Sequence, residues 1–454
     1  MPSIDQIAAA LQGYDPKALP AEQVNQFLAR LVEPVDGTDT VGVFDALGRV
    51  LAADVVSPIS VPPHDNSAMD GFAFDGALLR PGQPLALTLA EGTAFAGKAW
   101  AGNLTEGQCV KIMTGAIMPA GLDTVVPLEF VTVEGKQITI PANVLQRGDN
   151  RRLLGEDLMA GQPALRRGQT LGPAALGLIA SLGLPRVNVF RRLKVAYFST
   201  GDEILSLGET PREGAVYDSN RYTVFGLLTR LGVEVIDMGV VKDEPAALEA
   251  AFRQAGREAD AIITSGGVSM GEADHTKAMM KQLGDVAFWR IAMRPGRPMA
   301  VGRIARDAVE EARFAAGPPQ GESAPSGGSA PREAGSVGAV LFGLPGNPVA
   351  VMVTFLAFVR PALQRMIGCS ACEPILLKAH STEALRKKPG RTEYQRGIVT
   401  CAADGSLQVR TTGNQGSGVL SSMVQANGLI VLHHGQGNVA VGDEVDVMMF
   451  DGVI

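Results

Sequence analysis

The spacing of hydrophobic positions changes twice in the first part of the chain. Residues 20–35 carry apolar side chains at helical intervals, which predicts a helical N-terminus. Residues 61–146 switch to short alternating runs separated by Gly, Pro and Asn, which predicts a small β domain. Residues 147–192 return to a helical pattern, with Pro173 suited to a first turn. We therefore expect residues 1–60 and 147–192 to form one helical domain that the β domain interrupts.

The rest of the chain alternates between strand-like and helical segments. Over residues 193–304, apolar runs such as LKVAYFST, VEVIDMGVV and DAIITSGG are separated by helical spacing. This alternation is typical of a parallel sheet with helices on both faces, a doubly wound α/β domain that we place at residues 193–368. Residues 306–337 are rich in Gly, Pro, Ser and Ala, which predicts a disordered insertion between two strands without a catalytic role. Residues 369–454 show short β-like runs, which predict a small barrel or sandwich.

Composition narrows the classes of function. The 454 residues are 46% hydrophobic and 19% charged, with a formal net charge of −7. This balance suits a soluble protein of several domains and gives no general affinity for nucleic acid, so it points to a small-molecule substrate. The N-terminus lacks the features of a signal peptide, and the longest apolar run, residues 349–359, is far shorter than the about 20 residues of a membrane span. We expect a cytoplasmic protein without a membrane partner and a buried helix at this run.

A Gly-rich loop is the first candidate for chemistry. Residues 260–280, DAIITSGGVSMGEADHTKAMM, indicate a strand, a Gly-Gly loop and a helix. The loop exposes backbone N–H groups and the helix start adds a partial positive charge, so an oxyanion can bind there. An ordinary turn with Asp274 as the helix N-cap explains the same residues. The location favours binding, because ligands of open α/β sheets lie off the carboxyl ends of the strands.

Acidic residues are expected at the same edge of the sheet. The segment STGDEI ends the first strand, and YDSNRYTVFGLL opens the helix that follows. Together with acids further along, these segments could bind Mg²⁺, which prefers hard oxygen ligands. Each acid alone could equally cap a helix or lie on the surface. The acidic residues of this group are Asp202, Glu203, Asp218, Asp243 and Asp274.

Two Pro-Gly turns follow strand-like residues. MRPGRP at residues 293–298 places Arg294 and Arg297 on a rigid turn, and GLPGNP occupies residues 343–348. Fixed guanidinium groups suit recognition of phosphate or molybdate, since each offers a planar set of donors. Ordinary surface arginines remain the alternative for either residue in isolation.

Polar motifs also occur in both predicted β regions. HDNSAMDGFAFD at residues 64–75 and MTGAIMP at 113–119 fall in the first region, where side-chain-bonded turns would also explain them. RTEYQRG at 391–397 and TGNQGSG at 412–418 fall in the second. The chain lacks an H-E-x-x-H motif, so a zinc hydrolase is unsupported.

The order of these motifs resembles that of a known family. Over about residues 20–450 the chain is similar to the molybdopterin molybdenumtransferases, a family that includes the E domain of gephyrin. The resemblance implies a central doubly wound α/β molybdopterin-binding domain, a split N-terminal helical domain, a β-rich insertion and a C-terminal β-barrel. It also implies a homodimer whose cleft lies between the α/β domain of one subunit and the β insertion of the other.

The resemblance further implies a reaction. Members insert molybdate into molybdopterin-AMP and release AMP in a Mg²⁺-dependent final step of molybdenum cofactor synthesis. A molybdopterin adenylyltransferase and a non-catalytic scaffold of the gephyrin kind are the alternatives; the additional β domains disfavour the first and the retained acids disfavour the second. Expected partners are the small-molecule substrates, a second copy of the chain, a molybdopterin adenylyltransferase and molybdoenzyme chaperones.

Matching motifs carry the family's roles onto this chain. Many members have Lys where this chain has Arg294 and Arg297, a change that keeps the charge and removes a titratable amine. The expected catalytic residues, of which the first three would also bind Mg²⁺, are Glu203, Asp243, Asp274, Asp65 and Thr114. The expected substrate contacts are Ser265, Gly266, Gly267, Ser269, Asp70, Arg152, Asp157, Arg294, Arg297, Pro345, Gly346, Asn347, Arg396 and Ser417.

Overall fold

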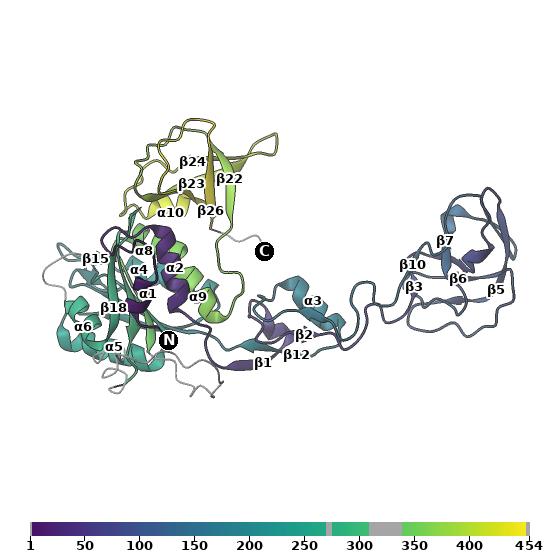
Figure 1. Ribbon diagram of the computed structural model, residues 1–454, viewed down its shortest axis with the longest axis horizontal. Coiled ribbons are helices and arrows are strands. Elements are labelled where there is room, and N and C mark those ends of the chain that lie inside the picture. Colours follow the sequence, from purple (N-terminus) through teal and green to yellow (C-terminus); the bar gives the residue numbers. More distant parts are fainter. Residues whose placement is uncertain (1, 269–274, 308–337, 451–454) are drawn as a thin grey trace. The chain divides into compact units, whose positions relative to one another are not determined.

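Two compact units make up the chain (Figure 1). The computed structural model describes residues 2–268, 275–307 and 338–450. Unit 1 comprises Met1–Ala52, Arg167–Gly172 and Asn188–Ile454. Unit 2 comprises Ala53–Arg166 and Pro173–Val187. The helical N-terminus, the α/β domain and the C-terminal β domain therefore lie in unit 1, and the β insertion lies in unit 2.

A six-stranded sheet forms the centre of unit 1. Its first four strands run parallel, whereas the last two are antiparallel to their neighbours. The predicted parallel pairing holds for the first four strands. β20 is reversed, because residues 291–297 join β18 to it and so short a connection cannot form a helical crossover. In sheet order the strands are β16 (Glu234–Val241), β13 (Lys194–Thr200), β17 (Ala261–Ser265), β21 (Ala339–Leu344), β20 (Pro298–Ile304) and β18 (Gly284–Arg290).

Both faces of this sheet are buried, which confirms the doubly wound fold class. In β13, Val195 and Tyr197 join one core cluster, whereas Ala196 and Phe198 join the other, as the alternation of a strand requires. Helices α5 (Pro245–Glu258) and α6 (His275–Leu283) cover the second face (Figure 1). The first face is covered by α1 (Ile4–Ala9), α2 (Ala21–Leu31), α4 (Ser219–Arg230), α8 (Pro348–Thr354) and α9 (Arg360–Ile367).

The longest apolar run forms a buried helix, as predicted. A π-helical segment, Phe355–Val359, joins α8 to α9. The helix Pro348–Ile367 is long and apolar enough to span a membrane. All residues of its π-helical segment are buried in the core of unit 1, so packing against the sheet accounts for its apolar character.

A closed five-stranded barrel follows α9 and confirms the barrel that the family resemblance implied. β23 pairs with both β24 and β25, and β22 and β26 complete the ring. The short strand β19 (Met293–Arg294) pairs with β23, which ties the first Pro-Gly turn to the barrel. The barrel strands are β22 (Leu376–Ser381), β23 (Thr392–Cys401), β24 (Leu407–Thr411), β25 (Gly428–Leu432) and β26 (Glu444–Met449), with α10 (Ser421–Gln425) between β24 and β25.

Unit 2 is built on a second six-stranded sheet. Two short antiparallel pairs accompany it, β3 (Asn66–Ser67) with β10 (Arg151–Arg152) and β2 (Val55–Val56) with β11 (Pro163–Leu165). Among the residues of unit 2, one α-helix is present, α3 (Pro173–Ser181), which begins at the predicted proline. The sheet order is β7 (Thr124–Pro127), β4 (Gly71–Phe74), β6 (Gln108–Ile112), β5 (Leu85–Ala94), β9 (Gln137–Ile140) and β8 (Thr132–Glu134).

Two short segments connect the flanks of the β insertion. Strand β1 (Thr38–Gly42) pairs with β12 (Arg186–Phe190). Isolated bridges join Val50 to Thr170 and Leu51 to Val189. The chain before the insertion is therefore hydrogen-bonded to the chain after it, while α1 and α2 pack into the core of the α/β domain.

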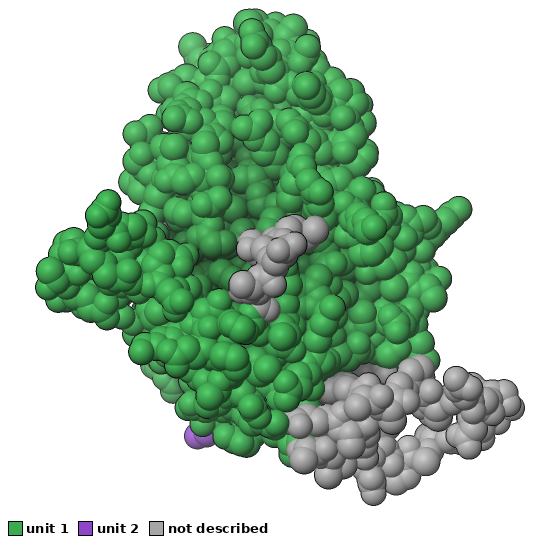
Figure 2. Space-filling model, turned by 90° about the vertical axis from the view of Figure 1, so that its left-hand side faces the viewer, with its two compact units in different colours: residues 1–52, 167–172, 188–454 green, residues 53–166, 173–187 purple. Residues whose placement is uncertain are grey.

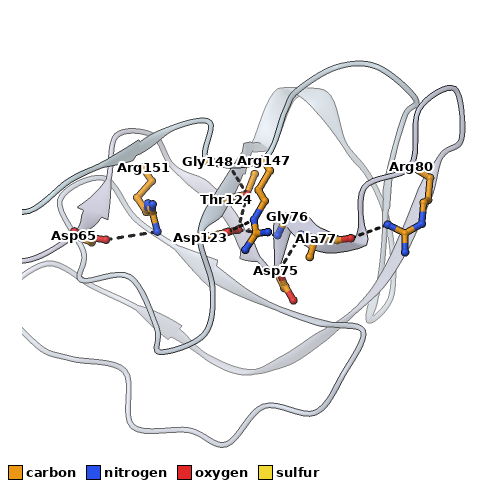
Figure 3. Close-up of polar contacts among 10 residues, drawn as sticks. All are labelled: Asp65, Asp75, Gly76, Ala77, Arg80, Asp123, Thr124, Arg147, Gly148 and Arg151. Atoms are coloured by element: carbon orange, nitrogen blue, oxygen red, sulfur yellow. Dashed lines mark hydrogen bonds and ion pairs between the residues drawn. The ribbon is translucent and has the colours of Figure 1, made fainter.

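An aspartate ties three segments of unit 2 together (Figure 3). Asp123 accepts hydrogen bonds from Arg147 Nε at 2.5 Å, from the N–H of Gly76 at 2.8 Å and from Thr124 Oγ1 at 2.9 Å. Burial alone would raise the pKa of Asp123, but these hydrogen bonds outweigh it and hold the pKa below its ordinary value of 3.8. The ionised carboxylate therefore stabilises the folded state above that pH.

Replacing this carboxylate should destabilise unit 2. Asp123→Asn keeps the shape and loses the charge and one acceptor, so we expect the free energy of unfolding at pH 7 to fall by about 1–3 kcal/mol. The difference from wild type should shrink as the pH falls from 3.8 through the lowered pKa of the folded state, because the wild-type carboxylate becomes protonated in the folded protein only at that lower pH. Thermal denaturation at pH 7 and over a series of pH values below 3.8 measures both effects. Glu91→Gln removes an exposed ion pair with Lys136 and should change little; equal losses in the two variants would contradict the assignment.

Candidate functional site

A cavity of about 620 Å³ lies in unit 1 at the carboxyl edge of the α/β sheet. Its walls come from the end of β13, the loop after β17, the two Pro-Gly turns and one loop of the barrel. Figure 2 shows the surface of unit 1 hollowed between the barrel above and the α/β domain below. The predicted residues that line the cavity are Glu203, Asp243, Gly266, Gly267, Arg294, Arg297, Pro345, Gly346, Asn347 and Ser417.

The other predicted residues of unit 1 have different positions. Ser265 and Arg396 are buried and do not line the cavity. Ser269 and Asp274 lie outside the described residues. The described part of the chain contains no group of three or more His, Cys, Asp or Glu side chains close enough to hold a metal ion.

The Gly-rich loop requires glycine at both positions. Gly266 and Gly267 have positive φ angles of 93° and 64°. A Cβ atom at Gly266 would lie 2.3 Å from the carbonyl oxygen of Thr200, and one at Gly267 would lie 2.5 Å from the Cβ of Thr276. Because the N–H of Gly266 already donates to Leu344, an oxyanion held by this loop must use donors further along it.

Ser265 supports this loop from behind. Its hydroxyl lies 2.8 Å from Tyr197 Oη and 3.1 Å from Ser199 Oγ, and the last two groups are also 2.8 Å apart. Each hydroxyl can donate one bond and accept another, so the three form a closed ring. Burial raises the pKa of Tyr197 against the effect of these bonds, and the phenol stays neutral.

Two of the predicted acids reach the cavity. Asp243 Oδ1 accepts a hydrogen bond from Thr276 Oγ1 at 3.2 Å. The carboxylate of Glu203 lies so close to Gly201 that a Cβ there would be 2.6 Å from its Oε2. Asp202, the neighbour of Glu203 in sequence, does not line the cavity.

Arg396 is a buried cation beneath the barrel loop. It is 1% exposed and uses four of its five N–H donors, on Ser422 Oγ and on the carbonyl oxygens of residues 414–416. Burial, aided by the nearby charge of Arg294, lowers the pKa of Arg396 to about 10. The group is still protonated at neutral pH, and no ion pair with an acid accompanies it in the described part of the chain.

In unit 2 the structure brings the two polar motifs side by side. Asp70 Oδ1 accepts hydrogen bonds from the N–H and the hydroxyl of Thr114, at 2.7 and 2.6 Å. These bonds lower the pKa of Asp70. The N–H of Met118 donates to the carbonyl oxygen of Asp65, so residues 65–70 run along residues 114–118.

The remaining predicted residues of unit 2 lie on the chain that follows the sheet. Asp65 accepts from the N–H of Leu154 at 2.8 Å and forms an ion pair with Arg151 at 3.6 Å (Figure 3). Arg152 lies opposite Asn66 in the β3–β10 pair. Asp157 donates its N–H to the carbonyl oxygen of Val61.

Several residues that line the cavity were not among the predicted site residues. Except for Ala350, which lies in the apolar run 349–359, they fall inside the motifs named above, so the motif as a whole was the available signal. Which residues of a motif face the cavity depends on the path of the backbone, and the amino-acid pattern of the motif does not determine that path. These residues are Thr200, Gly201, Val268, Pro295, Gly296, Pro298, Ala350 and Gln415.

Three family models match consecutive parts of the chain. The MoeA N-terminal region (domains I and II) matches residues 19–183. A probable molybdopterin binding domain matches residues 196–365, the part that contributes most of the cavity wall. The MoeA C-terminal region (domain IV) matches residues 378–450.

Full-length relatives agree with these matches. A molybdopterin molybdenumtransferase of Haemophilus influenzae is 38% identical over 92% of this chain and 95% of its own length. Another, from a Nostoc species, is 34% identical over 90% of this chain and 88% of its own. The crystal structure of the molybdopterin biosynthesis protein moeA from Pyrococcus horikoshii covers 96% of this chain and 100% of its own, with 25% identity and a TM-score of 0.74. The chain belongs to the molybdopterin molybdenumtransferase family.

Proposed function

We propose that this protein inserts molybdate into adenylylated molybdopterin and releases AMP, as the final step of molybdenum cofactor synthesis. One observation carries the proposal: two acids, a Gly-rich loop and two Pro-Gly turns, one of which bears two arginines, converge on one cavity of the domain that matches a molybdopterin binding model. Both substrates are anions. Because the chain as a whole carries a net charge of −7, it must bind them through local cations and amides.

The cationic groups have distinct roles in this proposal. Arg294 and Arg297 are exposed at the cavity, so their guanidinium groups are free to bind phosphate or molybdate oxygens directly. Arg396 contributes its charge from beneath the barrel loop, where four of its N–H groups are bonded within the protein. Ser417 and Asn347 add neutral polar groups at the same wall.

The cavity also fits Mg²⁺. This ion usually takes one or two protein carboxylates and completes its shell with water and substrate phosphate oxygens. Glu203 and Asp243 supply two hard carboxylates beside the loop proposed to hold phosphate, and the hydroxyl of Thr276 orients one of them. When bound, Mg²⁺ would offset the negative charge of the phosphoanhydride and so favour its cleavage. Asp274 stays a prediction for this site.

The reaction can be tested directly with the purified protein. Incubation with molybdopterin-AMP, molybdate and Mg²⁺ should release AMP and yield a cofactor that reconstitutes an apo-molybdoenzyme. Omitting molybdate tests whether AMP release depends on the second substrate. Adenylylation of free molybdopterin from ATP would instead indicate an adenylyltransferase, and no turnover at all would contradict the proposal. We place the reaction in the cytoplasm, with delivery by an adenylyltransferase and chaperones as a further expectation.

Removing the charge of either cavity acid should abolish most of the activity. We expect Glu203→Gln and Asp243→Asn each to lower kcat by about 100-fold or more. Each variant loses a negatively charged ligand that would hold Mg²⁺ at the reacting phosphate. Thermal stability should stay within a few degrees of wild type. The matched control Glu209→Gln removes an exposed carboxylate that does not line the cavity. Near-wild-type kcat in both cavity variants would refute their role.

Exposed apolar side chains on α4 and in the segment before it support the proposed homodimer. Tyr222 and Phe225 on α4 are each 47% exposed, and Val216, Tyr217 and Leu207 are exposed in the preceding segment. An apolar patch of this kind marks an interaction site in soluble proteins. In unit 2, exposed Met69 and Leu128 accompany the Asp70–Thr114 pair, and the N–H of Leu128 donates to the carbonyl oxygen of Asp70. We propose that unit 2 of a second copy covers the α4 face and brings its polar motifs to the cavity.

A charge on the α4 face should dissociate the dimer. Phe225→Asp would desolvate a carboxylate at the interface, so the variant should sediment as a monomer at concentrations where wild type is dimeric. The variant should also lose activity, because the monomer lacks the polar motifs that the second copy brings to the cavity. Val424→Asp places the same charge on the barrel, at a valine that is 84% exposed, and should remain dimeric. Sedimentation velocity over a concentration series measures both; a dimeric Phe225→Asp would exclude this face.

A further inference from the structure

Asn220 supports the wall of the cavity from behind. It lies in the first turn of α4 and is 7% exposed. Its Nδ2 donates a hydrogen bond of 2.7 Å to the carbonyl oxygen of Gly346, which lines the cavity. Asn220 does not line the cavity. It therefore fixes a wall residue without being in a position to touch a ligand.

The wall that Asn220 fixes continues into the barrel. Asn347, the next residue after Gly346, donates from Nδ2 to Ser417 Oγ at 3.2 Å. The N–H of Val349 donates to the carbonyl oxygen of Ser417, also at 3.2 Å. Because Gly346 and Asn347 are adjacent in a Pro-Gly turn, the position of the first determines where the second meets Ser417.

Ser417 belongs to the loop that surrounds Arg396. Arg396 donates to the carbonyl oxygens of residues 414–416, and the side chain of Gln415 returns two bonds to the backbone of Arg396. A displacement of Ser417 would therefore shift the loop relative to the buried charge. Hydrogen bonds thus connect Asn220 to Arg396 through two turns.

Stability alone does not explain an asparagine at this position. Within the described residues, Asn220 Oδ1 is buried and has no hydrogen-bond donor. An unpaired buried carbonyl destabilises the folded state. In contrast, Asn427 in the barrel uses both ends of its amide, with Oδ1 accepting from and Nδ2 donating to the backbone of Val399. Asn220 retains its donor to Gly346 at the expense of an unpaired acceptor.

We infer that Asn220 is a positioning residue for the reaction: its bond to Gly346 sets the geometry at which the Pro-Gly turn and the barrel loop enclose the anionic substrate. The inference rests on the proposed function. According to this inference, Asn220 affects substrate affinity and the order of the barrel loop that contains Ser417. It does not contact the substrate itself.

Two variants test the inference in the full-length protein. Asn220→Ala removes the amide, and Asn220→Asp keeps the shape while it replaces the donor with an oxygen. In both, the KM for molybdopterin-AMP should rise about tenfold, with a smaller change in kcat. Hydrogen–deuterium exchange of residues 412–420 should become faster, since the loop loses its anchor. The matched control Asn427→Ala should lower the melting temperature and leave KM unchanged.

A double mutant separates one connected path from two independent ones. If Asn220 acts through the Pro-Gly turn, adding Asn347→Ala to Asn220→Ala should raise KM by less than the product of the two single effects. Wild-type KM and wild-type exchange in both Asn220 variants would overturn the inference, as would independent effects in the double mutant. Absence of turnover in the wild-type protein would count against the proposed function, whereas the exchange of residues 412–420 would still test the positioning.

Discussion

Parallel pairing of β13, β17 and β21 is the constraint on which the cavity depends. Parallel neighbours end at the same edge of a sheet, so the segments after residues 200, 265 and 344 meet although they are far apart in sequence. The antiparallel β20 begins at this edge, because Ala300 lies opposite Gly343, one residue before the end of β21. The reversal of β20 is therefore what brings the turn with Arg294 and Arg297 to the cavity. A parallel β20 would have started at the opposite edge.

The electrostatics of the cavity follow from Arg396, which forms no ion pair with an acid among the residues that the structure describes. Carbonyl oxygens of the barrel loop satisfy the hydrogen bonds of Arg396 but carry no net charge to balance it. Its pKa of about 10 leaves it protonated, and the neighbouring Arg294 adds a charge of the same sign. Two cations close together in a partly desolvated site favour an anion between them. An acidic protein can in this way build a site for a negatively charged ligand.

Local patterns in the sequence were sufficient for part of this arrangement. The apolar runs predicted the strands, and the Gly-Gly and Pro-Gly motifs predicted turns at their ends, because both signals depend on neighbouring residues. The direction of β20 and the position of Ser265 behind its loop depend on pairing across the sheet, which no local pattern encodes. For the same reason the sequence pointed to Arg396 as a ligand contact, whereas the structure places it beneath Gln415 and the rest of the loop. Asn220 was not predicted as a site residue, because its hydrogen-bond partner Gly346 is distant in the chain.

The two edges of the α/β sheet differ in how completely their buried polar groups are paired. At the amino edge, Asp260 accepts two bonds from Arg191 and one from the N–H of Lys194, and these outweigh the effect of burial and lower its pKa. At the carboxyl edge, Asp218 caps α4 with one oxygen, and its other oxygen is buried without a donor among the described residues, as are the hydroxyls of Thr200 and Thr264. Apolar replacements of the two threonines would remove unpaired hydroxyls and stabilise the fold. Unpaired polar groups therefore concentrate at the edge of the sheet where the cavity lies. This is expected where residues are kept for ligand binding although they lower the stability of the fold.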